Sequence, residues 1–262
     1  MSNENEGAEA AHTLREQLDI GNAPISNIFT IFDLLNIDVI FVQADNNEHG
    51  FTARDEKSKA IVVVVNCHLP YARLRSTLAH ELAHISFSDD LTNLNTHLYS
   101  SDSEIRANAF SRHFLLPLAA VSNWWDKAAT KDTHRFLNSL VRNFGVSPAI
   151  AAFQMSNADL IDDAVCEQYR QESSRSLAKN YGWEDLLQNR VNEIHTKKEP
   201  KLLKEKAITA FHNGKITQNE LAAILKCTVT DVARNFPISS LRESKTDVAD
   251  PIILDDDLSD LL

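Results

Sequence analysis

The residues with the clearest chemical potential are two histidines and a glutamate in the stretch His80-Glu81-Leu82-Ala83-His84. In a helix, residues four apart project from one face, about 6 Å from each other. Two imidazoles placed in this way can both reach one Zn²⁺ ion at about 2.0–2.1 Å. Glu81 is turned about 100° around such a helix, too far to share the ion but close enough to hydrogen-bond a water bound to it. The spacing therefore predicts a hydrolytic metal site with Glu81 as the proton acceptor.

A catalytic zinc site needs a third protein ligand and an open position for water. The best candidate is Glu104, because it lies twenty residues after His84, in the first turn of the next expected helix. Antiparallel packing of the two helices would bring its carboxylate to the imidazoles. A capping box formed by Ser101 and Glu104 explains the glutamate equally well. Asn108, one turn further along, is expected to hydrogen-bond a ligand, whereas His113 points about 180° away from Glu104.

Hydrophobic periodicity indicates the elements that must position these residues. A helix over residues 72–87 carries an apolar stripe of four side chains, Leu74, Leu78, Leu82 and Ile85. A second helix is expected from about Ser103 to Leu116, where Pro117 interrupts it. Short β-branched or aromatic runs predict strands at 38–42, 51–53 and 61–65. The expected fold class is α+β, with a small mixed β-sheet packed on a helical core and an all-helical C-terminal region.

Four segments are expected along the chain. They are a disordered N-terminus at 1–9, a main domain at 10–160, a helical region at 161–240 and an acidic tail at 241–262. Within the third segment, residues 202–236 resemble a helix–turn–helix unit. Its second helix offers only Arg234 and Asn235 to base edges, beside the repulsive Asp231. This pattern favours packing or protein docking over specific DNA binding.

The composition excludes several classes of protein. The chain of 262 residues is 43% hydrophobic, enough for a sizeable core, and its six glycines are too widely spaced for a Rossmann fingerprint, a P-loop or a nucleophile elbow. The net charge of −11 argues against a protein whose whole surface binds the backbone of a nucleic acid. Three distant cysteines cannot form a disulfide framework. The chain has no apolar run long enough for a membrane span and no secretory signal, so a cytoplasmic location is expected.

Three motifs in combination resemble the ImmA/IrrE family of metallopeptidases. They are R-x-T-L-A-H-E-L-A-H at 75–84, E-x-x-A-N-x-F at 104–110 and L-L-P at 115–117. The resemblance covers roughly residues 10–160 and implies zinc bound by His80, His84 and Glu104, with Glu81 as general base. Family members are intracellular proteases whose usual substrates are helix-turn-helix repressors of stress genes or mobile elements. Ser76 and Ala83 depart from the family pattern, where an aromatic residue and a glycine are common, but neither change removes a ligand.

Two classes of function are therefore compared. The first is a zinc-dependent endopeptidase, also able to use Mn²⁺ or Fe²⁺, that cleaves a helix-turn-helix repressor or an antitoxin-like regulator. The second is a non-catalytic, metal-stabilised regulatory or DNA-binding scaffold. Glu81 favours the enzyme, because a purely structural site has no need of a base. Structural zinc sites are also normally closed by four protein ligands, with cysteine prominent.

Overall fold

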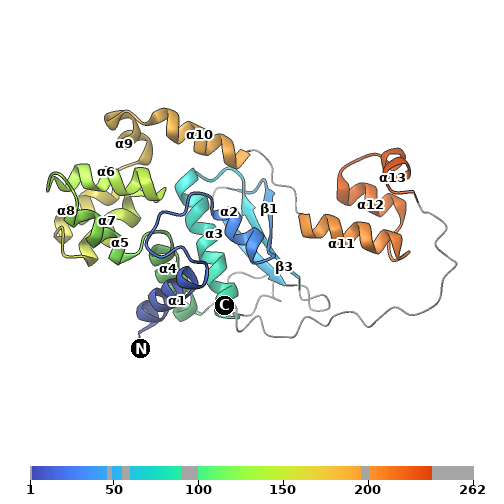
Figure 1. Ribbon diagram of the computed structural model, residues 1–262, viewed down its shortest axis with the longest axis horizontal. Coiled ribbons are helices and arrows are strands. Elements are labelled where there is room, and N and C mark those ends of the chain that lie inside the picture. Colours follow the sequence, from blue (N-terminus) through green and yellow to red (C-terminus); the bar gives the residue numbers. More distant parts are fainter. Residues whose placement is uncertain (1, 46–48, 55–59, 90–99, 196–200, 238–262) are drawn as a thin grey trace. The chain divides into compact units, whose positions relative to one another are not determined.

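The computed structural model describes residues 2–45, 49–54, 60–89, 100–195 and 201–237. They belong to two compact units, Met1–Lys198 and Glu199–Leu262. The N-terminal unit combines a three-stranded sheet with helices α1 to α10, and the C-terminal unit contains helices α11 to α13 (Figure 1). The expected α+β class, with a small mixed sheet and a helical C-terminal region, is confirmed.

The sheet supplies one polar side chain to the site described below. Its strands are β1 (Asp38–Val42), β2 (Gly50–Arg54) and β3 (Ile61–Asn66), in the order β1-β3-β2. β1 runs parallel to β3, and β2 runs antiparallel to it. Because side chains alternate between the two faces, the paired residues Val39, Val63 and Thr52 form one buried row across the sheet. Thr52 is the polar member of this row and lies on an edge strand.

Two helices form the centre of the N-terminal unit. Helix α3 (Tyr71–Ser86) packs on β2 and β3, and α4 (Ser101–Leu115) packs on α3 (Figure 1). The apolar stripe predicted for α3 is fully buried, with Leu74, Leu78 and Leu82 at 0% exposure. Buried Arg75, on the same helix, donates to the carbonyls of Ile25 at 2.8 Å and Phe144 at 3.2 Å. α3 is therefore held by the sheet, by α4, by the segment before α2 that contains Ile25 and by the end of α6.

The first residues of the chain are helical, so the expectation of a disordered segment over 1–9 is wrong for its described part. Helix α1 (Asn3–Gln17) begins after Ser2, whose hydroxyl accepts from the amide of Asn5. It packs along α4, and Gly7, Ala11 and Leu14 are buried. Glu4 and Glu6 of this helix pair with Arg112 and Arg106 of α4, a tertiary effect that local composition does not reveal.

The remaining helices of the N-terminal unit surround this centre. They are α2 (Ile28–Leu34), α5 (Leu118–Asp126), α6 (Thr133–Phe144), α7 (Pro148–Asn157), α8 (Asp163–Arg170), α9 (Ser174–Tyr181) and α10 (Glu184–His195). The indole of Trp183 donates to Asn138 at 2.8 Å in a buried contact between the α9–α10 turn and α6. The compact unit consequently extends to Lys198, beyond the boundary expected at residue 160.

The C-terminal unit has its own small core. Helices α11 (Lys201–His212), α12 (Gln218–Leu225) and α13 (Val229–Asn235) bury five side chains together: Ala207, Phe211, Leu221, Ala222 and Val232. α12 and α13 each begin with a capping box, Thr217 with Glu220 and Thr228 with Asp231. A short turn through Lys226 joins them, as expected for a helix–turn–helix arrangement. The acidic tail expected at 241–262 lies outside the described residues.

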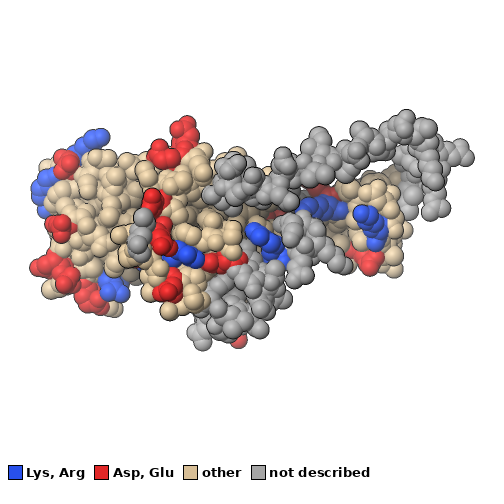
Figure 2. Space-filling model, turned by 90° about the horizontal axis from the view of Figure 1, so that it is seen from below, with Lys and Arg blue, Asp and Glu red and all other residues tan. Residues whose placement is uncertain are grey.

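The described surface is acidic on the face shown in Figure 2, where Asp and Glu side chains are spread over the N-terminal unit. This agrees with the net charge of −11. Within the described part of the chain, no helix combines the length and the apolar composition needed to cross a bilayer.

Candidate metal centre

Helix α3 carries His80, Glu81 and His84, as the sequence predicts. His84 is completely buried and Glu81 is 5% exposed, whereas His80 is partly open to solvent. The two imidazoles lie one turn apart with their Nε2 atoms 3.1 Å from each other. Burial of the apolar stripe on either side of this turn fixes the face of the helix that the histidines share.

Helix α4 brings Glu104 to the two histidines. Its Oε2 lies 3.4 Å from Nε2 of His80, and its Oε1 lies 3.4 Å from Nε2 of His84. Asn108 follows Glu104 by four residues on α4, and it lies opposite His80, which precedes His84 by four residues on α3. The two helices therefore run antiparallel, as expected. The cap of α4 is Ser100, which accepts from the amide of Ser103. The structure therefore does not place Glu104 in a capping box with Ser101.

The three side chains fit a divalent metal ion. Their ligand atoms all lie within 4.8 Å of one another. In a tetrahedral site with bonds of about 2.0–2.1 Å, neighbouring ligand atoms are about 3.3–3.4 Å apart. The separation of 3.1 Å between the two Nε2 atoms is close to that value, and each oxygen of Glu104 lies 3.4 Å from one of these nitrogens. A group of two imidazole nitrogens and one carboxylate can thus hold a metal ion and leave a position open.

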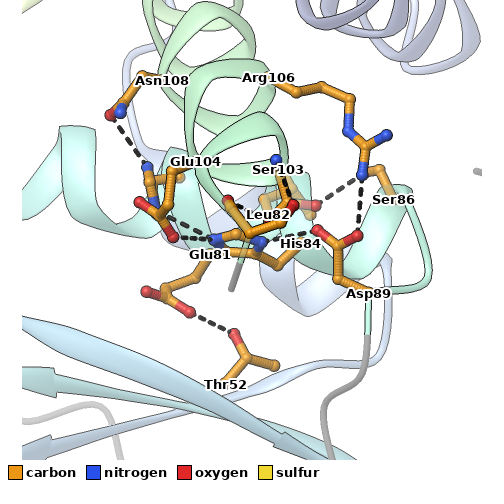
Figure 3. Close-up of polar contacts among 12 residues, drawn as sticks. Thr52, Glu81, Leu82, His84, Ser86, Asp89, Ser103, Glu104, Arg106 and Asn108 are labelled. Carbon is orange, nitrogen blue, oxygen red and sulfur yellow. Dashed lines mark hydrogen bonds and ion pairs between the residues drawn. The ribbon is translucent and has the colours of Figure 1, made fainter. Parts of the chain in front are cut away.

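The second nitrogen of each imidazole has a partner that orients the ring. Nδ1 of His80 lies 3.2 Å from Oδ1 of Asn108, the contact expected for that asparagine. Nδ1 of His84 lies 2.8 Å from Oδ2 of Asp89, which the sequence analysis did not select (Figure 3). Ser88, with φ of +52°, turns the chain back at the end of α3 and brings Asp89 beside the histidine. Such partners fix the tautomer, so that Nε2 is left for the metal.

Glu81 is held by a residue of the sheet. The hydroxyl of Thr52 donates to Oε2 of Glu81 at 2.8 Å (Figure 3). Burial raises the pKa of Glu81, and the hydrogen bond from Thr52 and the nearby histidines counteract part of that effect. Thr52 was also missed by the sequence analysis, because its role depends on the pairing of β2 with β3. The carboxylate is therefore oriented, and it has the raised proton affinity that suits a base.

The charges of the ligand group depend on one another. Hydrogen bonds with His80 and His84 hold the pKa of Glu104 far below its ordinary value. Burial opposes protonation of His84, but Glu104 and Asp89 outweigh it and raise the pKa of that imidazole. The carboxylates thus create a negative potential at the two ring nitrogens. A divalent cation is the natural counter-charge for this arrangement.

The ligand group opens into a cleft of about 1120 Å³. His80, Glu81, Glu104 and Asn108 all line it. One wall comes from the start of β2, and another is the apolar beginning of α7, where Pro148, Ala149, Ile150 and Phe153 contribute. The cleft is large enough for several residues of an extended peptide.

Comparison with protein families agrees with this geometry. The family model for the IrrE N-terminal-like domain, which describes a family of peptidases, matches residues 33–156 of this chain. The chain contains an IrrE N-terminal-like domain. The resemblance inferred from the motifs is therefore confirmed. Comparison with curated proteins gives no significant match.

The IrrE N-terminal-like domain, as matched, contains the sheet, α3, α4 and most of α7. It thus includes the metal-ligand group, Glu81 and both walls of the cleft. Helices α1 and α8 to α10 lie outside the matched residues, although they belong to the same compact unit.

Proposed function

We propose that this domain is a zinc-dependent endopeptidase. The observation that carries the proposal is the position of Glu81. Its carboxylate is buried, oriented by Thr52, and placed in an open cleft beside His80, His84 and Glu104. A site that only stabilised the fold would not need a further, non-ligating carboxylate held in this way.

The residues of the chain have separate roles in the proposed hydrolysis. His80, His84 and Glu104 would hold the ion, which when bound supplies Lewis acidity toward a water and toward the scissile carbonyl. Glu81 accepts a proton from that water as its oxygen adds to the carbonyl carbon. The C–N bond then breaks, and Glu81 delivers the proton to the leaving nitrogen. Asn108 and Asp89 keep the imidazoles in the orientation that this requires. The same ligands also suit Mn²⁺ or Fe²⁺.

The substrate we propose is a helix-turn-helix repressor or an antitoxin-like regulator that controls stress genes or a mobile element. The support is the family resemblance, together with a cleft that is open to a peptide chain. The proposal places the reaction in the cytoplasm, where such a repressor acts.

The experiment compares the parent protein with a Glu81→Gln variant, each loaded with Zn²⁺, on the helix-turn-helix protein encoded beside its gene. Products are separated by electrophoresis and the cut is located by mass spectrometry. Cleavage by the parent alone, with equal metal content in both proteins, supports the mechanism. Full activity of the glutamine variant refutes it. A chelator-treated parent sample serves as a control for contaminating proteases of other classes.

For the C-terminal unit we propose protein docking or packing rather than DNA reading. Asp231 lies at the start of α13, where its carboxylate closes the capping box, and Arg234 and Asn235 are the polar side chains left for base edges. An electrophoretic mobility shift with duplex and single-stranded DNA at two salt concentrations tests this. A salt-sensitive shift would contradict the proposal.

A further inference from the structure

A connected series of contacts leads from the ring of His84 to helix α1. Oδ2 of Asp89 lies 2.8 Å from Nδ1 of His84, and Oδ1 of Asp89 accepts from Nη2 of Arg106 at 2.9 Å (Figure 3). Nη1 of Arg106 lies 3.7 Å from Oε2 of Glu6 on α1. The series therefore joins a metal-ligand candidate to a helix outside the residues that the family matches.

Arg106 has little freedom to move. Its guanidinium lies over the ring of Phe87, 4.1 Å from the centroid, at the end of α3. Its side chain is 23% exposed, and that of Asp89 is 14% exposed. An ion pair shielded to this extent, with one member stacked on an aromatic ring, holds the carboxylate more firmly than a surface pair does. Asp89 is consequently fixed from one side by Arg106 while it fixes His84 on the other.

The backbone of α1 touches α4 at the same residue. A Cβ atom on Gly7 would lie 2.3 Å from the carbonyl oxygen of Arg106 and 2.8 Å from the Cβ of Ala109. The close approach of the helices therefore depends on the missing side chain of Gly7. A shift of α1 would therefore displace Arg106 in two ways, through the backbone contact at Gly7 and through the ion pair with Glu6.

We propose that Arg106 is a positioning residue of the metal centre, through which the packing of α1 on α4 sets the affinity of the centre for its ion. The inference rests on metal binding by His80, His84 and Glu104, and it does not require peptide cleavage. It differs from a role in helix packing alone, in which Arg106 would stabilise the fold but leave the metal affinity unchanged.

Two glutamates of α1 provide a matched pair for the test. Glu6 and Glu4 each pair with an arginine of α4, and their side chains are similarly exposed, 38% and 40%. Glu4 pairs with Arg112 at 2.6 Å and with His113 at 3.8 Å, and neither residue has a described contact with Asp89 or His84. Glu4→Gln thus weakens the attachment of α1 without touching the series, whereas Glu6→Gln removes its outermost member.

The experiment measures Zn²⁺ and Co²⁺ affinity by competition with a chelator, the visible spectrum of the Co²⁺ form, and the melting temperature of the metal-free form. Asp89→Asn should weaken metal binding about 10–100-fold, and Arg106→Gln about 3–10-fold. Glu6→Gln should weaken it about twofold, and Glu4→Gln should leave it unchanged. The Co²⁺ spectrum should change in the Asp89 and Arg106 variants, because the ring of His84 is less firmly oriented. Arg106→Lys, which keeps the charge, should give an intermediate affinity and covers the case in which Arg106→Gln does not fold.

Parental affinity and spectrum in both Arg106 variants would overturn the inference, as would equal losses in Glu4→Gln and Glu6→Gln. A parent protein that binds neither ion would overturn it as well. Metal binding that responds as described, without cleavage of any substrate, would support the inference while removing the peptidase proposal.

Discussion

Replacing Thr52 with valine tests how the sheet controls the proposed base. The substitution keeps the branched shape of the side chain but removes the hydroxyl that donates to Glu81 at 2.8 Å. Both residues are nearly inaccessible to solvent, with exposures of 2% and 5%, so water does not readily replace the lost donor. A hydrogen bond to a charged group contributes about 1.5–3 kcal/mol. Part of this energy remains when the carboxyl is protonated, and the rest favours the carboxylate, so the variant should raise the pKa of Glu81 further.

The kinetic consequence depends on pH. Because Glu81 acts as a base only when it is deprotonated, the acid limb of the kcat/KM profile should move to higher pH. On that limb the variant should be about tenfold slower than the parent, and above it the two should converge. The assay is a pH series with a peptide that spans the mapped cleavage site. An acid limb at the same pH in both proteins would refute the reasoning.

Stability gives a second measurement that needs no substrate. A carboxyl whose pKa is raised by folding binds its proton more tightly in the folded state. Its charge therefore costs stability as the pH rises from the ordinary value of 4.5 through the folded-state pKa. Thr52→Val should lower the unfolding free energy of the metal-free form by about 1.5–3 kcal/mol above that pKa and by about 0.5–1.5 kcal/mol below it. Thr77→Val is the control, since Thr77 is a buried threonine that lines the cleft, whereas the described side-chain hydrogen bond on Glu81 comes from Thr52.

Three further predictions concern other parts of the chain. Arg15→Met should lower the unfolding free energy by more than about 3 kcal/mol, because buried Arg15 donates to the carbonyls of Gly21, Ala23 and Phe114; tryptophan fluorescence during denaturation measures this, and a loss below about 1 kcal/mol would contradict it. Zn²⁺ affinity should fall about tenfold per pH unit, for each proton displaced, once the pH drops below the raised pKa of His84. Calorimetric titration between pH 8 and 6 measures this, and an affinity that stays constant over that range would contradict the prediction. Leu221→Ala should unfold the C-terminal unit, whose core is small; circular dichroism should show lost helix while fluorescence from Trp124, Trp125 and Trp183 of the N-terminal unit stays constant, and a joint change would contradict independent units.

The sequence could predict the parts of the site that follow helical periodicity. His80 and His84 share a face because they are four residues apart on α3, and the same period places Asn108 one turn from Glu104 on α4. The sequence also leads us to expect antiparallel packing of the two helices, which would bring Glu104 to the imidazoles, and the contacts of Glu104 and Asn108 with the histidines agree with this arrangement.

The residues that the sequence did not reveal reach the site through tertiary structure. Thr52 lies under α3 because it pairs with Val63 across the sheet, and a register shift of one residue would turn it to the other face. Asp89 reaches His84 because Ser88 adopts a left-handed conformation that is uncommon for a residue other than glycine. Neither the strand register nor that turn has a local signal in the surrounding residues.

The first residues of the chain are a second case in which tertiary contacts decide the structure. Residues 1–9 are predicted to be disordered from the sequence, yet Glu4 and Glu6 both pair with arginines of α4. Local composition therefore underestimates order wherever opposite charges come together from distant parts of the chain. In this protein the effect reaches the proposed chemistry, because Arg106 joins one of these glutamates to Asp89 and thus to His84. The spacing of His80 and His84 predicts that they share a helix face, but the orientation of these candidate ligands depends on contacts from elements that the spacing does not include.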